Sequence, residues 1–281
     1  MRSILLALAL LVATQPALAQ SEAELRADEI LAEAMARYHA SLEGIQAIEL
    51  ELLQMSVPTQ MRMEVEWDEA GVPVLRPVSV TVMGTSVPAE QADFPGGAGI
   101  FETPLEDLQG AYRYEGEVEV MGRAAYHLSF TDPDPSGMGG ELLEEDQLEF
   151  LDGLGALYLD TETFDLLRME WAGEVMHEGS PESLSMYFES EDFAEVDGYR
   201  YPQVTRVETD AARFAIGDEE RELLAMQLEQ IRGSIPQGEI PEGEMGEMMR
   251  AVIEQADQLG RMLDEGVMEV VLEMRNVRVE R

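Results

Sequence analysis

The chain has 281 residues, of which 58 are acidic and 18 basic, so its formal net charge is −40 at pH 7. So acidic a protein repels nucleic acid and bare anionic lipid surfaces, and we expect it to bind neither. The chain has no cysteine, which excludes disulfides, thiol catalysis and an N-terminal lipid-modified cysteine. We interpret the acidic surface as serving solubility.

The N-terminus is typical of a secretory signal peptide. Arg2 supplies a positive start, 4–12 is an apolar run too short to remain as a membrane anchor, and 17–19 reads small-x-small. Later stretches stay well below the roughly 18 consecutive apolar residues that a membrane helix needs. We therefore predict cleavage after Ala19, export to the periplasm of a bacterium with an outer membrane, and a mature domain at 20–281 with no stable membrane insertion.

The first element of the mature chain is predicted to be an amphipathic helix at 21–42. Apolar residues, Ile30 and Leu31 among them, recur there at helical spacing between Glu and Arg side chains. Ser21 is the candidate N-cap, and Gly44 is placed to end the helix. One face of this helix should therefore pack on the rest of the protein.

Alternating apolar and polar residues predict an antiparallel sheet after this helix. The clearest example is Met61–Trp67, and the segment 155–171 reads as a hairpin with a polar turn at 160–164. Segments 84–110 and 131–140 are rich in Pro and Gly and are predicted loops. The predicted strands are 45–55, 61–67, 77–83, 112–120, 124–130, the two arms of 155–171, 183–190, 201–214 and 267–279.

The last third of the chain changes character. Segments 218–232 and 244–263 have helical periodicity and are joined by a hinge-like linker rich in Gly and Pro. We therefore predict an α+β fold: a strongly curved antiparallel sheet that forms an incomplete β-barrel with a helical lid. A helical insertion at 218–266 precedes the last strand.

The sequence offers few convergent polar groups of the kind that enzymes need. The three histidines, His39, His127 and His177, have neither zinc-site spacing nor a neighbouring Gly-x-Ser-x-Gly motif. Asp132 and Asp134 resemble a calcium loop only in part, because the Gly and terminal Glu of that motif are missing. The methionines at 245–249 suggest either copper(I) binding or flexible apolar packing. We predict no catalytic residue, no metal site and no cofactor.

An apolar cavity is the alternative that the strand pattern offers. Each methylene removed from water contributes about 0.8 kcal/mol, so one long acyl chain gains roughly 10 kcal/mol before ordering costs, with no elaborate polar site. Alternation identifies residues that share a face and leaves open whether a ligand or the protein's own core fills it. The candidate cavity residues are Met61, Met63, Val65, Trp67, Val78, Val80, Val82, Leu128, Phe130, Leu167, Met169, Trp171, Met186 and Phe188.

Three motifs in chain order resemble the LolA/LolB-like superfamily. Residues 116–126 read GEVEVMGRAAY, 157–163 read LYLDTET, and 196–202 read VDGYRYP, each at a turn between predicted strands. They follow an amphipathic first helix and precede a closing strand at 270–280, in the order that the superfamily shows. The helical insertion at 218–266 departs from its basic fold.

The resemblance implies an unclosed β-barrel whose cavity holds the acyl chains of lipids or lipoproteins. It thus predicts a non-enzymatic periplasmic carrier of the outer-membrane lipoprotein-sorting type, with membrane-associated transport proteins as possible partners. A regulatory module like RseB, which senses lipoprotein and binds a membrane partner through the insertion, is the alternative. A secreted hydrolase is the third and least supported reading.

Overall fold

The computed structural model describes residues 20–54, 57–68, 71–88, 110–131, 149–177, 179–210, 218–234 and 244–281. The predicted signal peptide, most of the predicted loop 84–110 and nearly all of the loop 131–140 lie outside these residues. The partial calcium motif of Asp132 and Asp134 also lies outside them.

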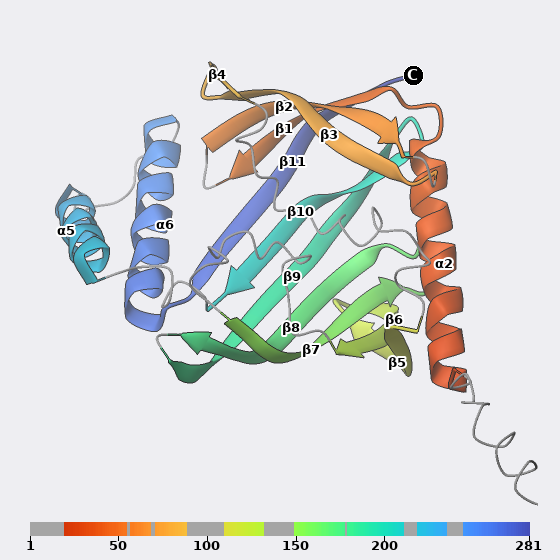
Figure 1. Ribbon diagram of the computed structural model, residues 1–281. Helices are drawn as coiled ribbons and strands as arrows, with labels where there is room; N and C mark the ends of the chain where they lie inside the picture. The colour runs from red at the N-terminus through yellow and green to blue at the C-terminus, as the bar shows by residue number, and fades with distance from the viewer. Residues whose placement is uncertain are drawn as a thin grey trace, which may run out of the picture.

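The described strands form one antiparallel sheet of eleven strands in the order β4-β3-β2-β1-β11-β10-β9-β8-β7-β6-β5 (Figure 1). The sheet is open, since β4 and β5 are its two edges and do not pair with each other in the described part of the chain. The strands are β1 (Ala47–Gln54), β2 (Val57–Trp67), β3 (Pro73–Val82), β4 (Thr85–Val87), β5 (Tyr112–Val120), β6 (Arg123–Thr131), β7 (Glu149–Asp160), β8 (Leu166–His177), β9 (Ser180–Val196), β10 (Tyr199–Thr209) and β11 (Met268–Glu280).

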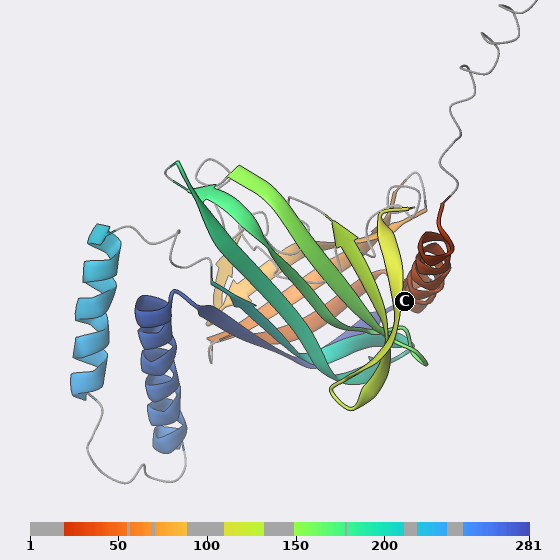
Figure 2. The same ribbon diagram turned by 90° about the horizontal axis from the view of Figure 1, so that it is seen from below.

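The sheet is strongly curved. Figure 1 shows β1–β3 at the top and β5–β8 at the bottom, joined by the long diagonal strands β9, β10 and β11. Figure 2 shows the same curved sheet from below, with the two groups of strands diverging away from the C-terminus. The described part of the chain therefore has the curved, unclosed sheet that the sequence predicts.

Helix α2 (Glu22–Leu42) begins and ends where the sequence predicts. The Ser21 hydroxyl accepts a hydrogen bond from the Glu24 amide at 3.2 Å, and the Ser21 amide donates to the Glu24 carboxylate at 2.7 Å. This reciprocal pair satisfies two of the free backbone donors at the helix start. Gly44, with φ of 73°, follows the last turn and redirects the chain into β1.

Helices α5 (Asp218–Ser234) and α6 (Glu244–Glu265) come between β10 and β11 in the chain, as predicted. They lie side by side at the opposite end of the sheet from α2 (Figures 1 and 2). Arg261 of α6 bonds to Glu269 at the start of β11, and the Gln258 amide donates to the Glu269 carbonyl. Among the described helices, none is long and apolar enough to cross a membrane.

Several strands are longer than predicted: β2 starts at Val57, β3 at Pro73 and β7 at Glu149, and β8 runs to His177. A short strand, β4, occupies the start of the predicted loop 84–110 and pairs with β3. Strand β9 covers 180–196 instead of 183–190, because β8 and β10 flank it and supply ladder partners even for its polar positions. Backbone pairing thus sets the length of β9, whereas hydrophobic alternation covers only its middle.

Candidate functional site

We call the face of the sheet that α2 contacts the inner face. One cross-strand row of side chains runs over it from β5 to β10, each residue the direct ladder neighbour of the next. Ile30, Leu31 and Met35 of α2 pack on this row. The row consists of Tyr114, Leu128, Leu157, Met169, Phe188 and Val207.

The same face continues onto β1–β3. Met61 and Met63 of β2 lie opposite Leu50 and Ile48 of β1, and these side chains share a cluster with Leu42 at the end of α2. Helix α2 thus contributes to the packing under both halves of the curved sheet. We call the part of the inner face that packs with α2, both on β1–β3 and along the cross-strand row, the helix end of the inner face.

A third cluster lies further along β7–β9, away from α2. Its buried members are Trp171, Val175 and Leu184, and Phe130 and Phe150 pack against it. Within the described residues, no side chain of α2 and no ionisable group belongs to it. We call these five residues the aromatic end of the inner face.

Most of the predicted cavity residues lie on the inner face. Val65, Val82 and Phe130 are partly buried and pack against its clusters. The others are buried there, namely Met61, Met63, Val80, Leu128, Met169, Trp171, Met186 and Phe188.

Three predicted positions do not belong to these clusters. Val78 is the extra residue where the β2–β3 register shifts, so its side chain leaves the row of Val80 and is 44% exposed. Trp67 ends β2 and is 45% exposed, with its ring 6.2 Å from that of His39. Leu167 falls at the β7–β8 irregularity and is buried in a separate cluster with Val120 and Ala125. Strand irregularities, invisible to simple alternation, cause two of these three differences.

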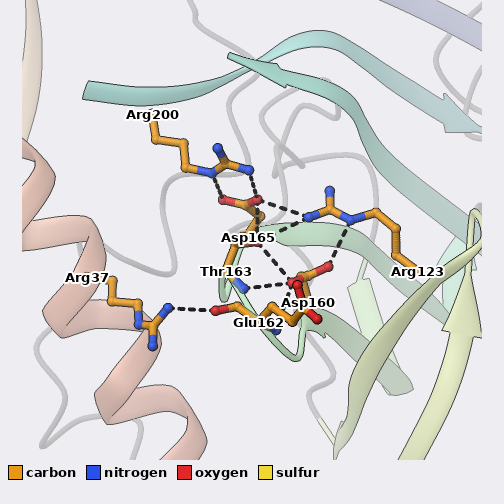
Figure 3. Close-up of polar contacts among 7 residues, drawn as sticks. All are labelled: Arg37, Arg123, Asp160, Glu162, Thr163, Asp165 and Arg200. Atoms are coloured by element: carbon orange, nitrogen blue, oxygen red, sulfur yellow. Dashed lines mark hydrogen bonds and ion pairs between the residues drawn. The ribbon is translucent and has the colours of Figure 1, made fainter. Parts of the chain in front are cut away.

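The turn between β7 and β8 holds a polar cluster (Figure 3). Arg200 makes a bidentate pair with Asp165, at 2.7 and 2.6 Å, and Arg123 approaches the same carboxylate at 3.4 Å. Thr163 donates its hydroxyl to Asp165 at 2.6 Å. These contacts join β6, the β7–β8 turn and β10, so the cluster holds the strand ends next to α2.

Asp160 organises the turn itself. Its carboxylate accepts hydrogen bonds from the amides of Glu162 and Thr163 at 2.8 and 2.7 Å and pairs with Arg123 at 2.8 Å. Burial alone would raise the pKa of Asp160, but the two amide donors, the Thr163 hydroxyl and the Arg123 charge outweigh it and lower this pKa. The Arg37 guanidinium of α2 donates to the Glu162 carbonyl at 2.7 Å and ties the helix to the turn. The arrangement is a clamp without a free nucleophile or base.

The opposite, outer face carries a polar ladder over β7–β9. Arg168 pairs with Glu189 at 2.7 Å and lies over the rings of Tyr158 and Tyr187, whose hydroxyls donate to Glu170 and Glu189 respectively. Burial, and then the bond to Glu189, raises the pKa of Tyr187 to about 12, and burial likewise raises that of Tyr158.

An open groove of about 760 Å³ runs along this ladder, next to small side chains such as Ala156 and Ala172. Its acidic residues include Glu189, which already binds Arg168, and Glu208, which binds Arg261. Over the described residues, no group of three His, Asp or Glu is placed to hold a metal ion. The predictions of no catalysis and no cofactor stay predictions.

Sequence reasoning missed the three glycines beneath the aromatic end. A Cβ added at Gly153 or Gly173 would fall 2.2–2.6 Å from atoms of the Trp171 ring, and one at Gly155 would fall 2.0 Å from the Phe130 ring. Glycines inside strands often mark such close approaches. The Gly-x-Gly at 153–155, on the strand next to Trp171, was the sequence feature that could have indicated this close approach.

Comparison with known proteins gives low similarity throughout. No family model matches the sequence, and no curated protein matches it. Among solved structures, a DUF1329 family protein from Desulfovibrio piger is 12% identical with a TM-score of 0.40, over 92% of this chain and 94% of that chain. The lipoprotein LppX from Mycobacterium tuberculosis is 10% identical with a TM-score of 0.25, over 54% of this chain and 90% of that one.

The complex of MucA and MucB from Pseudomonas aeruginosa contains a chain that is 12% identical with a TM-score of 0.20, over 63% of this chain and 79% of that one. With TM-scores below 0.5, these likenesses support no conclusion about this chain. We therefore infer the function from the residues and geometry of this chain itself.

Proposed function

We propose that the protein is a non-enzymatic periplasmic carrier that binds acyl chains of lipids or lipoproteins at the aromatic end of its inner face. The observation that carries the proposal is that the apolar inner face continues past α2 to Trp171, Val175 and Leu184. Helix α2 fills the helix end of a curved sheet and supplies no side chain to the aromatic end.

The chemistry of the aromatic end suits such a ligand. Its five residues carry no charge, so an acyl chain would gain about 0.8 kcal/mol per buried methylene without leaving a buried charge unpaired. Trp171 is only 1% exposed, so the groups packed around it, Phe150 among them, must move aside when a chain enters. Uptake should therefore depend on an opening step, with a rate that saturates as ligand concentration rises.

The two tryptophans of the chain permit a direct test. Trp171 is buried at the aromatic end, whereas Trp67 is exposed beside α2. The variant Trp67→Phe leaves Trp171 as the only indole, and Trp171→Phe leaves Trp67. Titration with dibromohexadecanoic acid should quench Trp171 strongly and saturably, because bromine quenches an indole only at close range, and should leave Trp67 nearly unchanged.

The control for this titration is unlabelled hexadecanoic acid, which must reverse the quenching by competition. Quenching of Trp67 alone would move the ligand to the helix end, and no saturable quenching of either indole would refute acyl-chain binding. Mass spectrometry of lipids extracted from protein purified from the periplasm would then identify the native ligand.

A regulatory module is the second candidate, and helix α5 favours it. Leu223 and Met226 lie three residues apart on α5, are 55% and 61% exposed, and form an apolar pair on a helix whose packing partner is α6. A sensor must convert ligand occupancy into a change at α5 and α6, whereas a carrier need not. Amide hydrogen exchange in α5 and α6 that is identical with and without bound hexadecanoic acid would exclude the sensor.

A further inference from the structure

Helices α5 and α6, which we call the helical arm, are separate from the apolar core of the sheet. Among the described residues, no side chain of the arm belongs to any of the four apolar clusters. Leu228 of α5 and Ala256 of α6 are nonetheless buried, and Arg221 of α5 donates to the Leu263 carbonyl of α6 at 3.3 Å. The arm therefore has packing of its own and does not share the core that holds the sheet together.

Polar contacts attach the arm to the sheet, and Arg261 of α6 is at their centre. Its guanidinium pairs with Glu269 at the start of β11 and with Glu208 of β10 at 3.5 Å. Arg206 of β10 binds the same Glu269 carboxylate at 2.7 Å, and the Gln258 side chain donates to the Glu269 carbonyl. We call these five residues the latch. The side chains of Arg261 and Glu208 are 42% and 44% exposed, so dissolved ions can reach it.

The arm and the sheet carry net charge of the same sign. Segment 218–265 has 13 acidic and 4 basic residues, a formal net charge of −9, and the rest of the chain has 45 acidic and 14 basic residues, a formal net charge of −31. Repulsion between the two bodies therefore opposes the attraction across the latch. The position of the arm depends on which of these two forces is stronger.

Dissolved salt weakens the two forces unequally. The Debye length is about 30 Å at 0.01 M salt and about 8 Å at 0.15 M. The ion pairs of the latch that join the arm to the sheet bring their atoms within 3.5 Å of each other, well inside both lengths. Helix α6, with 22 residues, is about 33 Å long, so many carboxylates of the arm lie beyond the shorter length from the sheet. Added salt therefore removes more of the repulsion than of the attraction.

We propose that the helical arm responds to ionic strength: the latch holds it on the sheet at physiological salt and above, and the arm moves away about Gly266 at low salt. Gly266, with φ of 71°, follows α6 and precedes β11. Opening separates Arg261 from Glu208, which lines the groove on the outer face, and so leaves that groove a free carboxylate. The inference does not depend on which ligand the inner face binds.

The test measures the distance between the arm and the sheet with pairs of spin labels, by double electron–electron resonance. The chain has no cysteine, so labels attach only at introduced ones. Leu223 of α5 and Leu154 of β7 are 55% and 68% exposed, and the pair Leu223→Cys/Leu154→Cys reports on the arm. The pair Met83→Cys/Leu154→Cys has both labels on the sheet and is the control. Between 0.5 M and 0.01 M NaCl, a longer distance should appear in the first pair only.

The variant Arg261→Gln removes the central cation of the latch. We expect it to raise the ratio of open to docked arm at 0.5 M NaCl by about tenfold, the usual effect of losing one hydrogen bond between charged groups. Arg275→Gln is the matched control, because Arg275 pairs with Glu273 of its own strand and its loss removes the same charge without touching the arm. This control should keep the wild-type distances.

Each alternative result contradicts a different part of the proposal. A longer distance that grows as salt is added would show that the latch is screened more than the repulsion, and the predicted direction would be wrong. Identical distances at both salt concentrations, in wild type and in Arg261→Gln, would show a fixed arm. Equal opening in Arg275→Gln and Arg261→Gln would show that net charge alone holds the arm. If Arg261→Gln does not fold, the salt titration of the labelled chain with Arg261 intact decides between a moving and a fixed arm.

Discussion

The helix end and the aromatic end of the inner face are built from the same alternating strands but are filled differently. At the helix end, Leu, Met and Phe side chains of the sheet meet Ile30, Leu31 and Met35 of α2 in one shared cluster. At the aromatic end, glycines replace side chains on β7 and β8, and rings lie over them. One end is packed against a helix and is expected to stabilise the fold, whereas the other receives no side chain from α2 and is where we propose that the ligand binds.

The largest expected effect tests the helix end. Leu31 is buried under α2, so Leu31→Ala should lower the free energy of unfolding by about 2–5 kcal/mol through lost burial and a residual cavity. Urea denaturation measures the change. Leu25→Ala, at an exposed position of the same helix, should change it by less than about 0.5 kcal/mol. If Leu31→Ala keeps its free energy of unfolding but no longer binds hexadecanoic acid, the helix end would be the ligand site and the distinction between the two ends would be wrong.

A ligand effect tests the aromatic end. Hexadecanoic acid at about 100 times its dissociation constant should raise the free energy of unfolding by about 2.7 kcal/mol, because it binds only the folded chain. The same amount should protect amides of β7 and β8 near Trp171 from hydrogen exchange, with little change in α2. Protection confined to α2 would contradict the distinction between the ends.

The clamp at the β7–β8 turn should show a pH effect. Because the folded state lowers the pKa of Asp160, its contribution to stability is complete above the ordinary aspartate pKa of about 3.9 and is lost as pH falls through the lower folded value. Asp160→Asn should cost about 1.5–3 kcal/mol at pH 7, the usual loss for hydrogen bonds to a charged group, and should flatten this acid dependence. If the free energy of unfolding falls equally at low pH in the variant and in wild type, carboxylates other than Asp160 cause this pH dependence.

The smallest expected effect is a control on the outer face. The pKa of Tyr187, about 12, should be the same with and without hexadecanoic acid, because Tyr187 lies on the other side of the sheet from its chain neighbours Met186 and Phe188. Ultraviolet titration of wild type and Tyr187→Phe isolates this group. A ligand-dependent shift would place the acyl chain in the outer groove beside Tyr187 and Ala172.

Much of the secondary structure follows from local pattern. Ser21 and Gly44 mark the ends of α2 because capping depends on residues a few positions apart. The strand β5 was predicted at its observed bounds, since a strand with regular alternation needs no distant partner to be recognised. The length of β9 was not predictable in this way, because it depends on two ladders with strands far along the chain.

In the candidate site too, local pattern predicted some features, whereas others depend on how distant strands pair. Alternation within each strand placed Met169 and Phe188 among the candidate cavity residues, and in the structure they are direct ladder partners on β8 and β9. The displaced positions of Val78 and Leu167 arise from register shifts between strands, which the residues of one strand do not encode. The polar cluster around Asp165 was missed because Arg123 and Arg200 approach it from separate strands.

The sequence by itself determined the acidic, cysteine-free character of the chain, the capped first helix, most of the strands in chain order and the two helices before the last strand. These depend on composition and on patterns within a few residues. Only the tertiary structure decided the neighbour order of the strands in the sheet, that α2 fills one end of its inner face, and that Trp171 and Phe130 lie over glycines at the other. Those features depend on curvature, register and close approach between strands, which arise when distant segments pair and pack.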